Sequence, residues 1–317
     1  MQLHQTITLA DGRTLAYADI GNPDHHPVLY FHGFPGSRLE AAFAEQTILD
    51  CQVRVIAVER PGYGRSSHDA TRKITDWPSD VAQLADSLGL EKFSLLGMSA
   101  GGVYALACAH GLPDRIYRTG IAGTLAPMDQ REVLKDMNWL SRNAFRLMSR
   151  DSVLARRLVG QLLGFCFKHY PRQLISGMKP SLCHNDRLAF ADRLFQQAFC
   201  KSLEEAYRQG YRGPYSDLTL VTKPWGFEPE DIPGPVHLWH GQRDTVVPHS
   251  MGQHIQSRLP NCQGRFPQDD GHFSIITNFM RQALLTLKAE QTRTREHEPR
   301  EEGTSQQATE VDLGQIA

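Results

Sequence analysis

The chain has 317 residues, with 34 lysine and arginine side chains against 35 aspartate and glutamate side chains, for a formal net charge of −1. A balance this close to neutral excludes a broad electrostatic attraction to nucleic acid or to an anionic membrane surface. Hydrophobic residues make up 40% of the chain, and no apolar run reaches the ~18 residues needed to span a bilayer. Residues 1–5 carry neither the basic nor the apolar region of a signal peptide, so we expect a cytoplasmic protein.

The cysteines point to a reducing compartment. None belongs to a Cys-x-x-Cys pair, and none has metal-ligand spacing with a histidine. We therefore expect free thiols and no metal site. The cysteines are Cys51, Cys108, Cys166, Cys183, Cys200 and Cys262.

Short β-type runs alternate with helical patterns, which indicates an α/β protein with a parallel or mixed sheet and helices on both faces. Asp11-Gly12, between the first two runs, is a hairpin signal. The nearly continuous apolar runs 28–31 and 53–58 are typical of central strands buried on both sides. Strands are predicted at 5–9, 13–17, 28–31, 53–58, 93–96, 117–122, 236–240 and 264–266, and core helices at 76–88 and 273–287.

Between about residues 125 and 215 strand signals are few, and apolar residues recur at helical spacing. This segment lies between two predicted strands and is too long for one crossover, so we interpret it as an inserted helical cap; ordinary core helices are the alternative. Ser202-Leu203-Glu204-Glu205 has the capping-box pattern of a helix start, and Gly210 is a candidate helix end. The apolar repeats are Val133, Met137, Leu140, Ala144 and Leu147; Leu154, Leu158, Leu162 and Phe165; and Leu188, Ala191, Phe195 and Phe199.

The predicted domain organisation is a core formed by residues 1–124 and 216–290, with the cap at 125–215. From residue 291 the chain is rich in Glu, Arg, Gln and Thr and has almost no large apolar residues. Such a composition cannot bury enough apolar surface to order itself, so we expect a disordered tail over 291–317.

The most informative motif is the pentapeptide Gly97-Met98-Ser99-Ala100-Gly101, which follows a predicted strand and precedes a predicted buried helix. A Gly-x-Ser-x-Gly sequence in this context is the signature of a nucleophile elbow, a sharp turn that presents its serine at the end of the strand. Glycine on both sides lets the strand and the helix approach closely. We therefore predict that Ser99 is a nucleophile.

A serine nucleophile needs a base and a group that orients the base. Asp244 follows a predicted strand and His272 precedes the last predicted helix, which is the order Ser…Asp…His typical of this motif. We predict that His272 is the base and Asp244 the acid. Asp129, at the start of the insertion, is the alternative acid. We interpret Asp269 and Asp270 as residues that shape the turn before His272.

An oxyanion hole needs backbone donors beside the nucleophile. Ala100, at the helix start, and Phe34, in the loop after the third predicted strand, are the candidate donors. Gly33 and Met98, their neighbours, are assigned to the substrate pocket. We expect His32 to brace its loop by hydrogen bonding.

Taken together, these motifs resemble those of serine hydrolases of the α/β-hydrolase fold, and the resemblance covers about residues 5–288. It implies an eight-stranded, mostly parallel sheet with helices on both faces, a helical cap after strand six, and a small-molecule substrate. It implies no metal or organic cofactor. The motifs are residues 32–36 (His-Gly-Phe-Pro-Gly), 60–66 (Arg-Pro-Gly-Tyr-Gly-Arg-Ser), 97–101, the Asp244 segment, Gly271-His272, and residues 224–227, which resemble a return-from-cap motif.

The resemblance favours hydrolysis of a carboxylic ester or related acyl bond with an apolar portion. C–C bond hydrolases, lactonases and cofactor-free perhydrolases keep a serine triad and remain alternatives. Dehalogenases and epoxide hydrolases of the fold use an aspartate nucleophile, which Ser99 argues against. Proline-specific aminopeptidases typically carry His-Gly-Gly-Pro-Gly, from which Phe34 departs. The contrasting class is a non-catalytic small-molecule receptor on the same scaffold.

Overall fold

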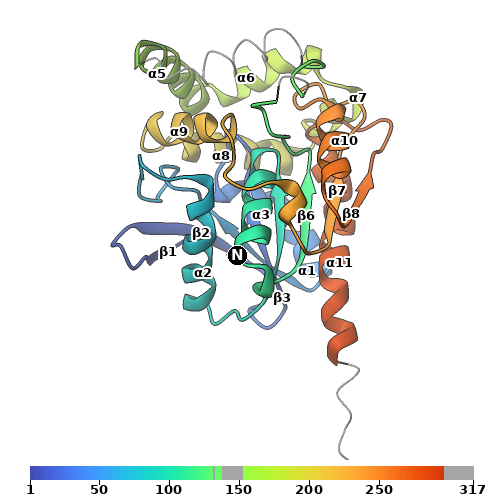
Figure 1. The fold of residues 1–317 in the computed structure, drawn as a ribbon. Helices are drawn as coiled ribbons and strands as arrows, with labels where there is room; N and C mark the ends of the chain where they lie inside the picture. The colour runs from blue at the N-terminus through green and yellow to red at the C-terminus, as the bar shows by residue number, and fades with distance from the viewer. Residues whose placement is uncertain (131–132, 138–152, 296–317) are drawn as a thin grey trace, which may run out of the picture.

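The structure, a computed structural model, describes residues 1–130, 133–137 and 153–295. Its strands form one eight-stranded sheet in the order β1-β2-β4-β3-β5-β6-β7-β8 (Figure 1). The β1–β2 and β2–β4 pairs are antiparallel, and the other neighbours are parallel. This confirms the predicted mostly parallel sheet. The strands are β1 (Gln2–Thr8), β2 (Thr14–Ile20), β3 (His26–Phe31), β4 (Val53–Val58), β5 (Phe93–Met98), β6 (Ile116–Ala122), β7 (Val236–Trp239) and β8 (Cys262–Arg265).

The burial of each strand follows its sequence pattern. Every residue of β3, β4 and β5 is buried, as the nearly continuous apolar runs 28–31 and 53–58 predicted for β3 and β4. Strand β1 lies at the sheet edge, and its residues alternate between exposed and half-buried. It begins three residues earlier than its apolar run indicated. The hairpin between β1 and β2 turns at Gly12, whose φ of +85° suits glycine.

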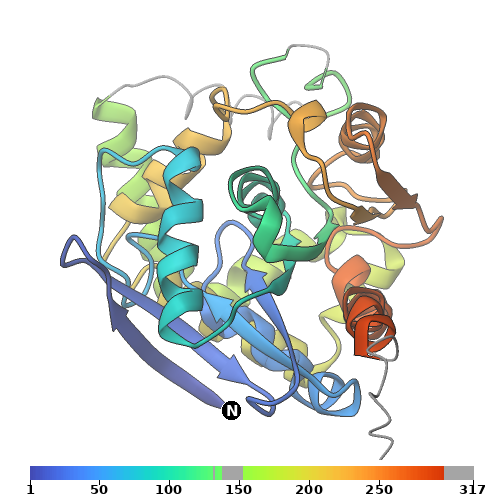
Figure 2. The same ribbon diagram turned by 60° about the horizontal axis from the view of Figure 1, so that its bottom comes forward.

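Helices cover both faces of the sheet (Figure 2). Leu29 and Phe31 of β3 pack in one core cluster with α2 (Trp77–Ser87), α3 (Ala100–Gly111) and α10 (His249–Arg258). Val28 and Tyr30, which alternate with them, pack in the other cluster with α1 (Glu45–Asp50) and α11 (Ser274–Arg295). The period of two along the strand therefore divides the core into two layers.

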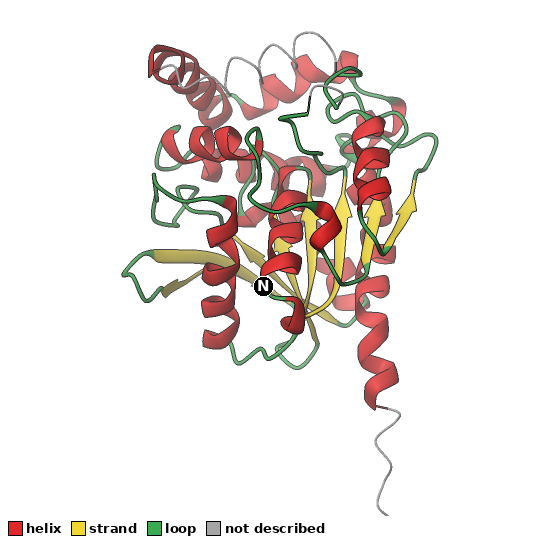
Figure 3. Ribbon diagram, in the orientation of Figure 1, coloured by secondary structure: helices red, strands yellow, loops and turns green. Residues whose placement is uncertain are grey.

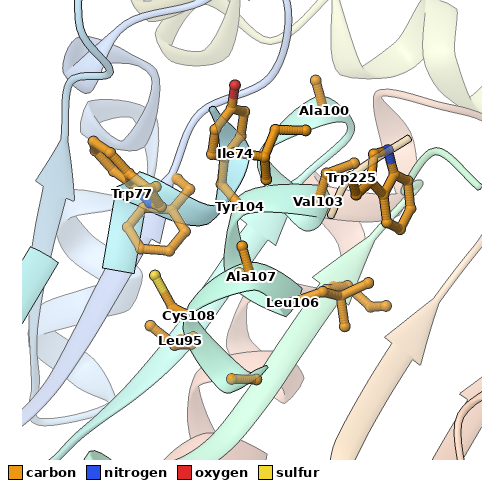
Figure 4. Close-up of a cluster of buried hydrophobic side chains, with 14 of the residues drawn as sticks. Ile74, Trp77, Leu95, Ala100, Val103, Tyr104, Leu106, Ala107, Cys108 and Trp225 are labelled. Atoms are coloured by element: carbon orange, nitrogen blue, oxygen red, sulfur yellow. The ribbon is translucent and has the colours of Figure 1, made fainter. Parts of the chain in front are cut away.

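Helix α3 lies at the centre of one layer and is buried from Ala100 to Ala109. Figure 4 shows its side chains among Trp77, Trp225 and their apolar neighbours. The rings of Trp77 and Tyr104 meet edge to face, with centroids 5.9 Å apart. This packing holds the helix that begins directly after Ser99.

The helical insertion follows β6, as predicted, and the chain returns to the sheet at β7. Its described helices lie beyond the carboxyl ends of the parallel strands, at the top of Figures 1 and 3. Val133 and Met137, expected in a helix, lie in a turn and a bend, whereas Leu140, Ala144 and Leu147 lie outside the described residues. The described helices between β6 and β7 include α5 (Val153–His169), α6 (Pro171–Met178), α7 (His184–Ala189), α8 (Arg193–Ala206) and α9 (Arg212–Val221).

One expected helix start in the insertion is wrong. Ser202 does not open a helix but lies inside α8, which begins at Arg193. The Asp192 carboxylate caps that helix by accepting the amides of the second and third helical residues. The Ser202 hydroxyl instead accepts the amide of Ser37 at 2.8 Å. The hydroxyl that the local pattern assigned to a helix cap therefore binds the backbone of Ser37, which is distant in the sequence.

Helix α11 runs to Arg295, five residues into the segment predicted to be disordered. Residues 289–295 contain no glycine or proline and include good helix formers, so local propensity continues the helix. The rest of the predicted tail, residues 296–317, lies outside the described residues. Within the described ranges, no helix combines the length and the apolar character needed to span a membrane.

Candidate functional site

Ser99 occupies a strained turn between β5 and α3. Its φ is +53°, a left-handed conformation that is uncommon for a residue with a side chain. A Cβ on Gly101 would overlap the carbonyl oxygen of Phe31, and a Cβ on Gly97 would overlap the backbone of Gly101. The two glycines of the predicted elbow are therefore required by close backbone contacts, and those contacts hold the turn that carries Ser99.

The structure brings His272 and Asp244 together. His272 lies just before α11, and its Nδ1 is 2.7 Å from Oδ2 of Asp244. Asp244 lies in the loop after β7, and its Oδ1 accepts the amides of Val246 and Val247 at 2.8 and 2.7 Å. These bonds fix the carboxylate, which in turn fixes the imidazole. Asp129, the alternative acid, is exposed in the loop after β6.

The surroundings of His272 favour a proton on its ring. Burial lowers the pKa of His272, but Asp244, with contributions from Asp186 and Glu40, raises that pKa above its ordinary value. His240 lies on the other side of the carboxylate, with Nε2 3.6 Å from Oδ2 of Asp244. Burial lowers the pKa of His240. The pKa values of the two imidazoles are thus shifted in opposite directions, upward for His272 and downward for His240.

The two candidate oxyanion donors lie beside Ser99. A Cβ on Gly33 would lie 3.5 Å from the Cβ of Ser99, which places the loop after β3 against the elbow. In the part of the chain that the structure describes, the amides of Phe34 and Ala100 have no protein acceptor. Unpaired amides beside a serine can bind a negatively charged oxygen.

The loop that carries Phe34 is held by hydrogen bonds from the side chains of His32 and Arg60. His32 Nδ1 contacts the carbonyl oxygen of Gly33 at 2.9 Å, in agreement with the bracing role expected for this histidine. The buried Arg60 guanidinium donates to the carbonyl oxygens of His32 and Gly33. Arg60 also pairs with Asp217 of α9 at 3.0 Å. Helix α9 is therefore connected through Arg60 to the predicted oxyanion loop.

A cavity of about 170 Å³ joins these groups. Ser99, His272 and Phe34 line it, as do Gly33 and Met98, the two residues assigned to a pocket from the sequence. Most of the remaining lining is aliphatic or aromatic, and much of it comes from the insertion. The insertion contributes Phe167, Leu174, Ile175, Met178, Phe195, Phe199 and Leu203.

Glu40 also lines this cavity and was not predicted from the sequence. Its buried carboxyl accepts the Tyr30 hydroxyl at 2.6 Å and the Gly33 amide at 3.2 Å. Burial raises the pKa of Glu40. The spacing Ser37-x-x-Glu40 matches a capping box, but the Glu40 carboxyl accepts the amide of Gly33 instead of the amide of Ser37. The local pattern therefore gave no indication that Glu40 lines the cavity.

Two buried carboxylates between β6 and β7 were also missed, Asp186 of α7 and Asp217 of α9. Asp186 contacts the His272 segment, and Asp217 contacts Arg60 and Arg72. Neither lies in a motif, so no local signal separates them from solvated helix residues. Within the described ranges, no group of three or more His, Cys, Asp or Glu side chains is arranged to hold a metal ion, and all six cysteines are free.

Comparison with known families agrees with this architecture. A family model described as alpha/beta hydrolase fold matches residues 26–279, which include every candidate site residue above. The chain therefore belongs to the α/β-hydrolase fold family, as its motifs predicted.

Individual relatives differ in how much of the chain they match. A poly(3-hydroxyalkanoate) depolymerase of Ectopseudomonas oleovorans is 24% identical over 269 residues, 84% of this chain and 85% of that protein. A non-heme chloroperoxidase of Streptomyces lividans is 33% identical over 125 residues, 39% of this chain and 45% of that protein. The chain thus spans less than half the length of the chloroperoxidase. An esterase from Exiguobacterium antarcticum shares the fold, with a TM-score of 0.63 at 20% identity, covering 91% of this chain and 98% of the esterase.

Proposed function

We propose that the protein is a serine hydrolase that cleaves a carboxylic ester or a related acyl bond. The observation that carries the proposal is the 2.7 Å contact between His272 and Asp244, at a cavity that His272 shares with Ser99. Ser99 is the proposed nucleophile, His272 the base, and Asp244 the group that orients the imidazole. The amides of Phe34 and Ala100 are the proposed oxyanion donors.

In this mechanism the Ser99 hydroxyl attacks the substrate carbonyl carbon, and its proton passes to Nε2 of His272. The carbonyl oxygen becomes an oxyanion held by the amides of Phe34 and Ala100. When the tetrahedral intermediate collapses, the imidazolium gives its proton to the leaving alkoxide and an acyl-enzyme remains. Water, deprotonated by His272, then releases the acid. Asp244 keeps the proton on Nδ1, so that Nε2 is the free base.

The cavity favours an uncharged substrate with an apolar portion. Among the described residues, no lysine or arginine lines it, and its walls are mainly aliphatic and aromatic. Because the insertion supplies many of these walls, we propose that residues 125–215 act as a cap that selects the substrate. Hydrolysis of lactones, cleavage of β-diketones and formation of peracids would use the same catalytic groups. Assays of all three reactions therefore distinguish the related activities. The chloroperoxidase likeness is the specific reason to include peracid formation.

The test is Ser99→Ala assayed on p-nitrophenyl acetate and butyrate, with folding checked by circular dichroism. Turnover is expected to fall by about 10⁴ or more. Ser257→Ala, an exposed helical serine, is the matched control and should keep full activity. Unchanged turnover in Ser99→Ala would refute the mechanism.

A fluorophosphonate probe separates an enzyme from a receptor on the same scaffold. We expect it to label the wild-type protein and Ser257→Ala but neither Ser99→Ala nor His272→Ala. Absence of label on folded wild-type protein would instead support a non-catalytic receptor.

A further inference from the structure

We propose that Asp186 is a positioning residue for His272, so that the insertion directly supports the catalytic base. This inference rests on the proposed serine hydrolase function. Asp186 belongs to α7 in the insertion, 86 residues from His272 in the sequence. Its carboxylate is fully buried against the segment where the chain enters α11.

The carboxylate binds three successive backbone amides. Its Oδ2 accepts the amide of His272 at 3.0 Å, and its Oδ1 accepts the amides of Phe273 and Ser274 at 2.9 and 2.8 Å. The first amides of a helix have no partner within the helix, and the positive end of the helix dipole favours an anion there. Asp186 thus caps α11 from a different part of the chain and fixes the backbone that carries the imidazole.

The neighbouring contacts show that the fit is tight. A Cβ on Gly271 would overlap Oδ2 of Asp186, so the glycine before His272 is required by this carboxylate. Asn185, the preceding residue of α7, donates to Oδ1 of Asp270 at 3.2 Å. Helix α7 therefore holds the segment 270–274 through two consecutive side chains.

This attachment bears on catalysis in two ways. First, Asp244 orients the His272 ring, while Asp186 holds the backbone beneath it, and both are needed to place Nε2. A displacement of about 1 Å at a reacting group can cost about 10²-fold in rate. Second, the Asp186 charge helps Asp244 and Glu40 to raise the pKa of His272, against the effect of burial. If Asp186 only capped the helix, it would stabilise α11 without affecting the placement or the pKa of His272.

The experiment compares Asp186→Asn with wild type by the pH dependence of kcat and kcat/KM on p-nitrophenyl butyrate. We expect kcat to fall by about 10- to 100-fold with little change in KM. The acid limb of kcat/KM should move to lower pH, because an anion that favours protonated His272 has been removed. The matched control is Asp192→Asn, which removes a charge from the insertion while keeping a capping oxygen on α8. Its kcat and its acid limb should equal those of wild type.

The outcomes are distinguishable. Wild-type protein without Ser99-dependent turnover would overturn the proposed function itself. Active wild type with an unchanged kcat, or an unshifted acid limb, in folded Asp186→Asn would overturn only the role of Asp186. If Asp186→Asn does not fold, Asn185→Ala decides, since it loosens the same attachment without leaving buried amides unpaired. A several-fold lower kcat at constant KM would support the proposal, and an unchanged kcat would contradict it.

Discussion

The carboxylate of Asp217 on α9 lies 3.0 Å from the guanidinium of Arg60, and both side chains are fully buried. Asp217 also accepts the hydroxyl of Tyr63 and pairs with Arg72 at 2.6 Å. Arg60 in turn donates to the loop that carries Phe34. Helix α9 and the predicted oxyanion loop are therefore parts of one buried polar network. Removing Asp217 would leave the charges of Arg60 and Arg72 in the interior without their anion.

Asp217→Ala is expected to lower the free energy of unfolding by about 3–5 kcal/mol, because Arg60 and Arg72 would remain buried without their anion. Urea unfolding followed by circular dichroism measures this loss. Asp86→Ala removes the partner of Arg115 in an ion pair whose Asp86 side chain is 65% exposed. That control should change stability by less than about 1 kcal/mol. Equal losses in the two variants would contradict the buried network.

Asp244→Asn is expected to lower kcat by about 10⁴, because the amide cannot hold His272 in the required tautomer. Esterase kinetics on p-nitrophenyl butyrate measure the effect. Asp129→Asn, at the exposed alternative acid, should retain wild-type kinetics. The reverse result would transfer the role of the triad acid to Asp129.

The pH profile should reflect the raised pKa of His272. Only the neutral imidazole can accept the Ser99 proton, so kcat/KM should fall as the pH is lowered through that pKa. Because Asp244 raises the pKa of His272 above its ordinary value despite burial, this loss should occur at a higher pH than for an unperturbed histidine. In Asp244→Asn the acid limb of the residual activity should move to lower pH. A kcat/KM that is constant across the histidine range would argue against His272 as the base.

Gly101→Ala is expected to destabilise the elbow, since its Cβ would overlap the carbonyl oxygen of Phe31. Overpacking of this kind typically costs about 1–3 kcal/mol, and the shift of α3 away from β3 should also displace Ser99 and reduce kcat. Thermal unfolding and esterase kinetics measure the two effects. Gly177→Ala is the control, because its Cβ would have no neighbour within 4 Å and alanine favours a helix by up to about 1 kcal/mol. A Gly101→Ala protein as stable and active as Gly177→Ala would show that the elbow tolerates a side chain.

Phe199→Ala should widen the cavity and shift the preference toward longer acyl chains. Its ring packs against Phe195 and Phe273, which also line the cavity. The ratio of kcat/KM for p-nitrophenyl octanoate to that for the butyrate should rise by about tenfold. Phe165→Ala removes a ring of the insertion that is 53% exposed and should leave the ratio unchanged. An unchanged ratio in Phe199→Ala would place the acyl chain elsewhere.

The positions of the strands along the chain, and the parts of the site that depend on local backbone geometry, could be predicted from the sequence, whereas the order of the strands within the sheet came from the structure. Nearly continuous apolar runs identified β3 and β4, because a strand buried on both faces shows no alternation. The Gly-x-Ser-x-Gly motif identified the turn at Ser99, since Gly97 is required where β5 contacts α3 and Gly101 where α3 contacts the end of β3. Asp244 and His272 were identified by their positions at strand ends, and the sheet brings such ends together.

Which buried carboxylates support the site depends on contacts between distant segments, and these are seen only in the folded protein. Asp186 contacts His272 across 86 residues of sequence, and Asp217 contacts Arg60 across 157. Glu40 has the sequence spacing of a helix-capping residue. The same separation explains the error at Ser202, whose partner Ser37 is 165 residues away. Burial of a polar side chain depends on partners that the fold supplies. A local sequence pattern predicts the backbone conformation of its own segment. The partner of a buried charge, in contrast, depends on how distant segments pack against each other.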